Sequence, residues 1–281
     1  MNVETPASSK TKVGGAMPDD PKRLFPALTP AERYHFDVYG YVIIKNLLTP
    51  DEVGSMKEAL YRLRTDLRAT KAANPDQQKP RYREARCLTD LPHHVYMGSI
   101  AQYDPALTHY ATHHKVVGAC EEVMGGRGHL VEVNAHINSK APTWPTASDG
   151  GPAFGFHRGL FNQEGIHTRN GLYHSNFVKV LTNLTDLGPD DGGTTVIAGS
   201  HKVDAGDEAI IKAAYQDRSH IHQIIAPAGS GVLFTEALIH ATGKITSDKE
   251  RVIIISGYTT SSFPFMLNEW PDNTQTWVPG F

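Results

Sequence analysis

Residues 131–138 read Val-Glu-Val-Asn-Ala-His-Ile-Asn, and this stretch decides the class of the fold. Its apolar residues alternate strictly with polar ones, which is the period of a β-strand with two unlike faces. The polar face carries Glu132, Asn134, His136 and Asn138. Such a strand packs its apolar face on a core and turns the other face to solvent or to a wet cavity. The alternation alone leaves both possibilities open.

More short strands are expected after this one. Each is a β-branched run bounded by Gly, Pro or Asp turns, and together they are residues 176–184, 194–198, 222–225, 232–234 and 252–258. Helices first and many short strands later predict an α+β protein. Its mainly β core is expected to be an antiparallel sandwich or barrel.

Two helix starts precede the strands. Thr29-Pro30-Ala31-Glu32 and Thr49-Pro50-Asp51-Glu52 each offer an N-cap Thr, a Pro at the first helical position and a Glu that completes a capping box. Residues 40–45 between them form a short strand pattern. We expect a further helix over 107–124 and a long surface loop over 70–105.

The composition indicates one domain that acts on a small molecule. The chain has 281 residues, 40% hydrophobic, which suits one large core. A net charge of −3 gives no electrostatic reason to expect nucleic acid or an anionic membrane as a partner. Cys87 and Cys120 form neither a disulfide framework nor a thiolate zinc site. With no apolar run of membrane-spanning length and no apolar core in the polar start Met1–Lys12, a cytoplasmic location is expected.

The first residues differ from the rest. Residues 1–28 mix Ser, Thr, Lys, Gly and Pro without apolar periodicity, so we expect a mobile N-terminal arm. Residues 29–281 are then one domain. The oligomeric state is not predicted.

Four segments in order carry a resemblance to a known family. They are Phe36–Ile43 with the helix start after it, Gly155-Phe156-His157-Arg158-Gly159, Gly192–Lys202, and Phe234–His240 followed by Arg251. Together they resemble the phytanoyl-CoA dioxygenase-like branch of the iron(II)- and 2-oxoglutarate-dependent oxygenases. The resemblance implies a double-stranded β-helix, a cupin-like jelly roll, flanked by N-terminal helices. It also implies an enzyme that uses Fe(II), 2-oxoglutarate and O2 to hydroxylate a C–H bond of a small organic substrate.

The resemblance assigns roles to particular residues. His157 matches the first histidine of the family's His-x-Asp metal motif, and His240 matches its distal histidine. Arg251 stands where the family places the arginine that pairs with the distal carboxylate of 2-oxoglutarate, and a guanidinium fork suits a carboxylate. Lys140 resembles a lysine that helps to hold the same co-substrate. It shares parity with His136, provided that the strand continues so far.

The motif is incomplete, because Gly159 stands where the family has the carboxylate ligand. Glu236 is the best candidate to complete the metal site, since it shares strand parity with Phe234 and lies four residues before His240. Two alternatives remain. The position of Gly159 could be left open for chloride, as in the radical halogenases of this superfamily, or the chain could be a non-catalytic cupin-type binding protein.

Polar residues are expected around the site, and they favour a polar substrate. The candidates for the pocket are Asn134, His136, Arg158, His174 and Asn176. Asp190, Asp191 and His201 are expected to shape turns rather than to bind metal.

Overall fold

The structure, a computed structural model, describes residues 27–160, 165–169, 172–261 and 263. The predicted N-terminal arm, residues 1–28, therefore lies outside the described residues except at its end. There Leu28 is buried, and its N–H donates to the carboxylate of Glu122 at 3.0 Å. The last residue of the predicted arm is thus docked on the domain.

Both predicted capping boxes are present. Thr29 caps α1 (Pro30–Tyr39) and Thr49 caps α2 (Pro50–Ala73), and in each box the Glu side chain accepts from the backbone N–H of its threonine. The remaining described α-helices are α3 (Pro105–Ala111), α4 (His114–Met124) and α6 (Asp207–Gln216), and short 3-10 turns lie at Ser200–Lys202 and Arg218–His220. Within the described chain, no helix combines the length and apolar character needed to cross a membrane.

The strands form two facing sheets and a hairpin, and every described pair is antiparallel. The large sheet contains, in order, β1 (Tyr41–Ile44), β11 (Gly231–Thr235), β8 (Phe177–Asn183), β13 (Arg251–Thr260), β5 (Gly128–Asn138), β4 (His94–Gly98), β3 (Ala85–Leu91) and β2 (Arg81–Tyr82). The small sheet contains β10 (Ile221–Gln223), β9 (Thr195–Ile197) and β12 (His240–Ala241), and the hairpin contains β6 (Ile166–Arg169) and β7 (Leu172–Ser175).

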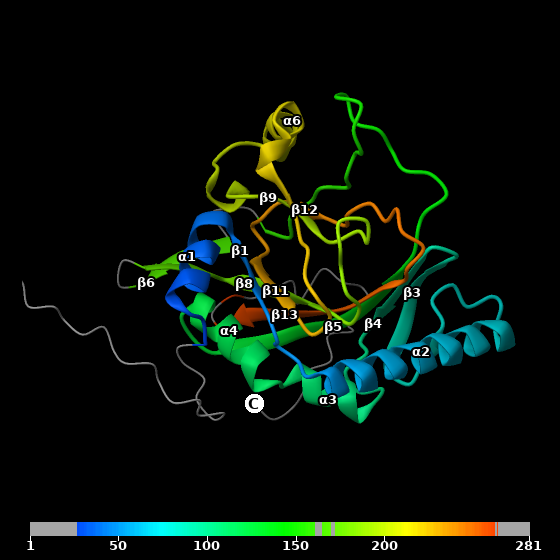
Figure 1. Cartoon of the computed structure of the whole chain (residues 1–281). Coiled ribbons are helices and arrows are strands. Elements are labelled where there is room, and N and C mark those ends of the chain that lie inside the picture. The colour runs from blue at the N-terminus through cyan, green and yellow to red at the C-terminus, as the bar shows by residue number, and fades with distance from the viewer. Residues whose placement is uncertain (1–26, 161–164, 170–171, 262, 264–281) are drawn as a thin grey trace, which may run out of the picture.

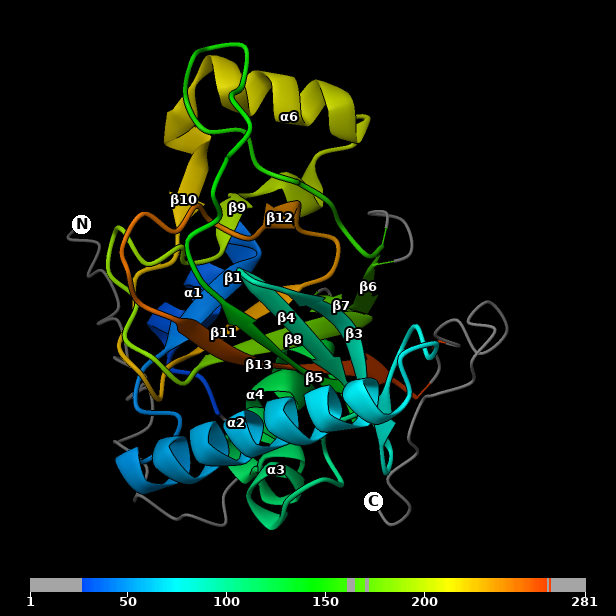
Figure 2. The ribbon, with the colours of Figure 1, turned by 90° about the vertical axis from the view of Figure 1, so that its right-hand side faces the viewer.

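The layers explain which side chains can reach a site. Figures 1 and 2 show α2, α3 and α4 along one side of the large sheet, with the small sheet and α6 on the other side. On β13, Val252 and Ile254 belong to the core shared with the helices, whereas Ile253 belongs to the core between the two sheets. Because alternate strand residues point to opposite faces, every second residue of the central strands faces the interior between the sheets. This is the predicted double-stranded β-helix.

Two predicted elements are wrong in detail. Residues 70–105 are not one loop, since β2, β3 and β4 lie there at the edge of the large sheet. The outermost strand, β2, is only two residues long, and β3 contains Arg86 and Asp90, so charged residues interrupt the apolar pattern there. The expected helix over 107–124 is two helices, because the backbone of His113 is extended (φ −61°, ψ 121°) and starts α4 anew.

Candidate active site

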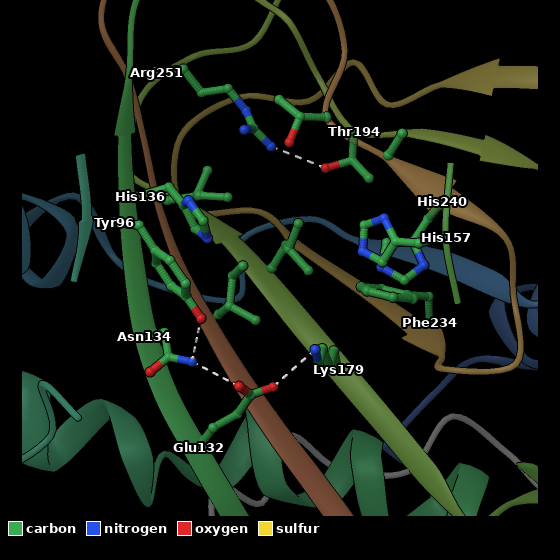
Figure 3. Close-up of a pocket in the computed structure, with 15 residues that line it drawn as sticks. Tyr96, Glu132, Asn134, His136, His157, Lys179, Thr194, Phe234, His240 and Arg251 are labelled. Carbon is green, nitrogen blue, oxygen red and sulfur yellow. Dashed lines mark hydrogen bonds and ion pairs between the residues drawn. The ribbon is translucent and has the colours of Figure 1, made fainter. Parts of the chain in front are cut away.

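Two histidines lie side by side because their backbones pair. The N–H of His157 donates to the carbonyl of His240 at 3.0 Å, and the N–H of His240 donates back at 2.9 Å. Residues directly opposite in an antiparallel pair point to the same face. The two rings accordingly lie with centroids 4.4 Å apart, and Figure 3 shows them together on one side of the cavity.

Each imidazole is oriented by a carbonyl of its own chain. Nδ1 of His157 lies 3.0 Å from the carbonyl of Gly155, and Nδ1 of His240 lies 2.8 Å from the carbonyl of Leu238. A carbonyl only accepts, so Nδ1 carries the proton in each bond and Nε2 is left with its lone pair. Burial lowers the pKa of His240 to about 4, against a smaller opposing effect of a nearby carboxylate. His240 is therefore a neutral imidazole at neutral pH.

The carboxylate of Glu236 fills the place that a side chain at Gly159 would take. A Cβ built on Gly159 would lie 1.9 Å from Oε2 of Glu236. The register is fixed by the carbonyl of Glu236, which accepts from the N–H groups of Gly159 at 3.0 Å and Leu160 at 3.2 Å. Oε1 of Glu236 lies 3.9 Å from Nε2 of His240. The three residues are thus brought together, the two histidines in the lining of the cavity and Glu236 buried beside them.

Lys179 keeps this buried carboxylate ionised. Its Nζ lies 3.3 Å from Oε1 of Glu236 and 3.0 Å from Oε1 of Glu132. Burial would raise the pKa of Glu236, but the charge of Lys179 holds it below its usual value. The network continues through Asn134, whose amide donates to Glu132 at 2.7 Å and to the hydroxyl of Tyr96 at 3.2 Å (Figure 3).

Arg251 is a buried cation at the other end of the cavity. It is 2% exposed, its Nη2 donates to Oγ1 of Thr194 at 3.0 Å, and its Nε has no partner in the part of the chain that is described. Burial lowers its pKa to about 10, which still leaves it charged at neutral pH. A buried charge without an anion is costly, so this end of the cavity is complementary to a carboxylate.

The cavity between these ends is about 250 Å³ and has a mixed lining. Its walls are Tyr96, Glu132, Asn134, His136, His157, Lys179, Leu181, Thr194, Phe234, His240, Ala241, Thr242, Arg251, Ile253 and Ile255. His136 stacks on Tyr96 with centroids 4.2 Å apart, and burial lowers its pKa to about 3. The polar face of β5 therefore faces a wet cavity rather than bulk solvent.

Several predicted residues lie elsewhere. Lys140 is exposed beyond the end of β5 and does not line the cavity. His174 stacks with His167 in the hairpin at 5.4 Å, and Arg158 pairs with Asp207 on α6. Like Asn176, neither is among the described lining residues.

The residues expected to shape turns do so. Oδ2 of Asp191 accepts from the N–H of Gly188 at 2.8 Å, and buried His201 lies against Gly40, whose left-handed φ of 81° ends α1. Lys179 and Thr194 were not singled out from the sequence. The sequence did offer a signal for Lys179, because it is a charged residue within the apolar run of β8.

The donor set fits iron(II). Two neutral imidazoles and one carboxylate are the ligands that non-haem iron oxygenases present on one face of the metal. The buried guanidinium of Arg251 provides a partner for an acidic co-substrate beside them. The residues present therefore fit both the metal and 2-oxoglutarate.

Comparison with known proteins agrees with this set of residues. The profile of the family described as Phytanoyl-CoA dioxygenase (PhyH) matches residues 36–253. Ectoine dioxygenase from Streptomyces coelicolor is 26% identical over 167 residues, which cover 59% of this chain and 49% of that relative. The matched region thus spans about half the length of this curated relative.

Solved structures share the fold at low identity. HygX from Streptomyces hygroscopicus, solved with nickel and 2-oxoglutarate bound, superposes with a TM-score of 0.62 at 18% identity, covering 84% of this chain and 88% of that chain. The 2-oxoglutarate-dependent epimerase SnoN from nogalamycin biosynthesis gives a TM-score of 0.56 at 16% identity, covering 82% of both chains. These likenesses establish the architecture.

Proposed function

Because the chain belongs to the phytanoyl-CoA dioxygenase family, we propose that it is an oxygenase that uses iron(II) and 2-oxoglutarate to hydroxylate a C–H bond of a small organic substrate. The family and the enzyme class, 2-oxoglutarate-dependent dioxygenases, are those that the sequence motifs predicted. The observation that carries the proposal for this site is the position of Glu236. Its carboxylate occupies the space above Gly159, where the family motif has its own carboxylate.

His157, His240 and Glu236 would hold the iron. The two imidazoles offer Nε2 lone pairs because their Nδ1 atoms are bonded to backbone carbonyls. Glu236 supplies the negative charge from the turn after β11 instead of from the position of Gly159. The number and type of ligands are kept, although one of them comes from a different part of the chain.

Arg251 and Thr194 would hold the distal carboxylate of 2-oxoglutarate. Arg251 is fixed by its bond to Thr194, and its remaining N–H groups suit a second, bidentate partner. Lys140, which was also predicted to bind the co-substrate, lies outside the cavity and has no part in this proposal.

Iron with bound 2-oxoglutarate supplies O2 activation coupled to oxidative decarboxylation of the co-substrate to succinate and CO2. The chain supplies orientation and exclusion of water. Phe234 packs on His240 with ring centroids 4.7 Å apart, and Ile253 and Ile255 line the cavity nearby. Lys179 holds Glu236 as a carboxylate, so its ligand atoms stay unprotonated.

Hydroxylation is favoured over halogenation by the same carboxylate. A halide would need the space above Gly159, but Oε2 of Glu236 lies there. The orphaned nitrogen of Arg251 and the paired histidines likewise favour an enzyme over a non-catalytic binding protein, which has no use for them together.

The lining favours a polar substrate. Glu132, Asn134, Lys179 and Tyr96 present charged and hydrogen-bonding groups at the end of the cavity away from Arg251 (Figure 3). HygX has been solved with hygromycin B bound, and ectoine dioxygenase is named for ectoine. A small polar molecule, O2 as oxidant and a cytoplasmic location complete the proposal.

The test is an anaerobic titration of Fe(II) and 2-oxoglutarate, followed by the visible charge-transfer band of the chelate. Wild type and a Lys140→Ala control should give the same band. Glu236→Ala should lower the affinity for iron by at least about 10-fold, so its band should be weaker at the same iron concentration. A band that persists in Glu236→Ala and shifts with chloride would favour the halogenase alternative. Absence of a band in wild type would rule out the oxygenase proposal.

A further inference from the structure

A second group of metal-type donors lies in the helical layer, away from the cavity between the sheets. It comprises Glu52 on α2, His109 on α3 and His113 at the start of α4, and one ligand atom from each lies within 4.8 Å of the others. Figures 1 and 2 both place α2 beside α3 beneath the large sheet. The three residues are therefore brought together by helix packing.

Glu52 is held with one oxygen turned to the histidines. Its Oε2 accepts from the N–H and the Oγ1 of Thr49, both at 2.8 Å, as part of the capping box. This fixes the carboxylate and leaves Oε1, which lies 3.4 Å from Nε2 of His113 and 3.8 Å from Nε2 of His109. One side chain thus caps a helix and presents an anion to two imidazoles.

These separations suit ligands of a common ion better than direct hydrogen bonds. An N–H···O bond is about 2.7–3.2 Å long, so both distances are too long for one. Ligands bound at about 2.0–2.2 Å around a tetrahedral zinc ion lie about 3.4 Å from each other. His113 is also 5% exposed, and its Nδ1 has no hydrogen-bond partner within the described ranges. The atom of His113 that faces Glu52 is Nε2, so this buried ring presents Nε2 to the cluster, and Nδ1 is not the donor atom in question.

The surroundings leave room for an ion but not for the chemistry of the first site. The cluster lines a cavity of about 370 Å³, together with apolar side chains that include Leu48 and Met56. Among the described lining residues there is no Arg or Lys to anchor an acidic co-substrate. The site therefore suits a cation alone.

We propose that Glu52, His109 and His113 bind a zinc ion. Two imidazoles and one carboxylate are ordinary zinc ligands, and the open side of the cavity leaves a fourth position for water. The ion ties the start of α2 to the junction of α3 and α4. Since α2 and α4 pack on the large sheet, it stabilises the layer that supports the strands of the first site.

The test uses the full chain carrying His157→Ala and His240→Ala, so that zinc added to it reports on the second site. Calorimetric titration should show one Zn²⁺ bound. Adding Glu52→Gln should weaken binding at least 10-fold while the capping box remains, because Gln also completes this box. Adding His109→Ala, which removes an exposed side chain, should do the same.

His114→Ala is the matched control. His114 stacks on His113 with centroids 4.9 Å apart, and its loss should leave zinc affinity unchanged within about 2-fold. Unfolding temperatures in a chelator, equal among all variants, show that each is folded. The proposal is overturned if the parent variant binds no Zn²⁺ at micromolar concentration, or if neither Glu52→Gln nor His109→Ala weakens binding.

Discussion

The same donor types, two histidines and one glutamate, gather at two places in this molecule, and the scaffolds differ. His157 and His240 are fixed by backbone pairing between strands, and each ring is oriented by its own carbonyl. His109 and His113 lie at helix ends near the surface, and only the glutamate of that set is oriented, by a helix cap. Donors alone therefore do not make an oxygenase. The buried Arg251 in the same cavity as the first set makes the difference, since the described lining of the second cavity holds no Arg or Lys.

Removing one histidine from each set should give the largest difference in activity between the two sets. His240→Ala should lower 2-oxoglutarate turnover by at least about 100-fold, because it removes one of the proposed iron ligands. His109→Ala should leave turnover within about 2-fold of wild type at saturating iron. Succinate formation over time is the measurement. A large loss in His109→Ala would mean that the helical set serves catalysis directly.

The arginine is the second point of difference. Arg251→Lys should raise the KM for 2-oxoglutarate by about 10- to 100-fold with a smaller fall in kcat, since a lysine replaces a bidentate contact by a point charge. Thr194→Val, which removes one hydrogen bond to Arg251, should raise KM by about 5-fold. Initial rates against 2-oxoglutarate concentration measure both. Equal KM values in all three proteins would contradict the assigned role.

The ion pairs of Lys179 beside the first set should contribute to the free energy of unfolding. Lys179→Met leaves Glu132 and Glu236 facing each other without their cation, so the free energy of unfolding of the metal-free protein should fall by about 3 kcal/mol. Lys249→Met is the matched control, because this lysine is exposed and its pair with Asp191 should contribute at most about 1 kcal/mol. Urea unfolding in a chelator compares them. Mn²⁺ with 2-oxoglutarate should restore part of the loss in Lys179→Met.

The smallest expected effect is a pH dependence from buried imidazoles. Burial lowers the pKa values of His136 and His201 to about 3, so both are neutral in the native state. In the unfolded chain these histidines have a pKa of about 6.5 and take up protons below it. The free energy of unfolding therefore falls as the pH falls from about 6.5 toward 3. Urea unfolding of the metal-free protein should show a loss of roughly 2–2.5 kcal/mol between pH 6 and 5.

An exposed histidine provides the control for this slope. His220→Asn, at a side chain that is 58% exposed, should leave the pH dependence unchanged, whereas His201→Leu should lower its slope by about half because His136 remains. A flat profile in wild type would mean that these rings are not held neutral by burial.

The sequence predicted most of the fold because local signals agreed with the final structure. Thr29 and Thr49 predicted both helix starts, and the alternation in residues 131–138 predicted β5 with its two faces. The strands over 81–98 were missed because their edge position admits charged residues. In those segments, pairing of β4 with β5, of β3 with β4 and of β2 with β3 outweighs local propensity.

The site was predictable in part from the family motif. His157, His240 and Glu236 lie together and Arg251 lies at the other end of the cavity, although their roles in binding iron and 2-oxoglutarate remain proposals. Lys140 does not reach the cavity, because β5 ends at Asn138 and parity has no meaning beyond the strand.

The helical donors could not be foreseen from the sequence. Glu52 lies far from His109 along the chain, and only the packing of α2 on α3 brings them together. The sequence predicted a role for Glu52 in the capping box of a helix. Nothing in the pattern indicated that its second carboxylate oxygen faces two imidazoles.

The central claim is that the carboxylate of Glu236 replaces the one that the family motif has at the position of Gly159. Moving the carboxylate back to position 159 tests this claim most directly. Iron-dependent succinate formation should be nearly lost in Glu236→Ala. It should be lowered in Gly159→Asp, where the added Cβ meets Oε2 of Glu236, and largely recovered in the double variant Gly159→Asp/Glu236→Ala. If the double variant is as inactive as Glu236→Ala while remaining folded, or if Glu236→Ala keeps full activity, the carboxylate of Glu236 does not replace the missing ligand.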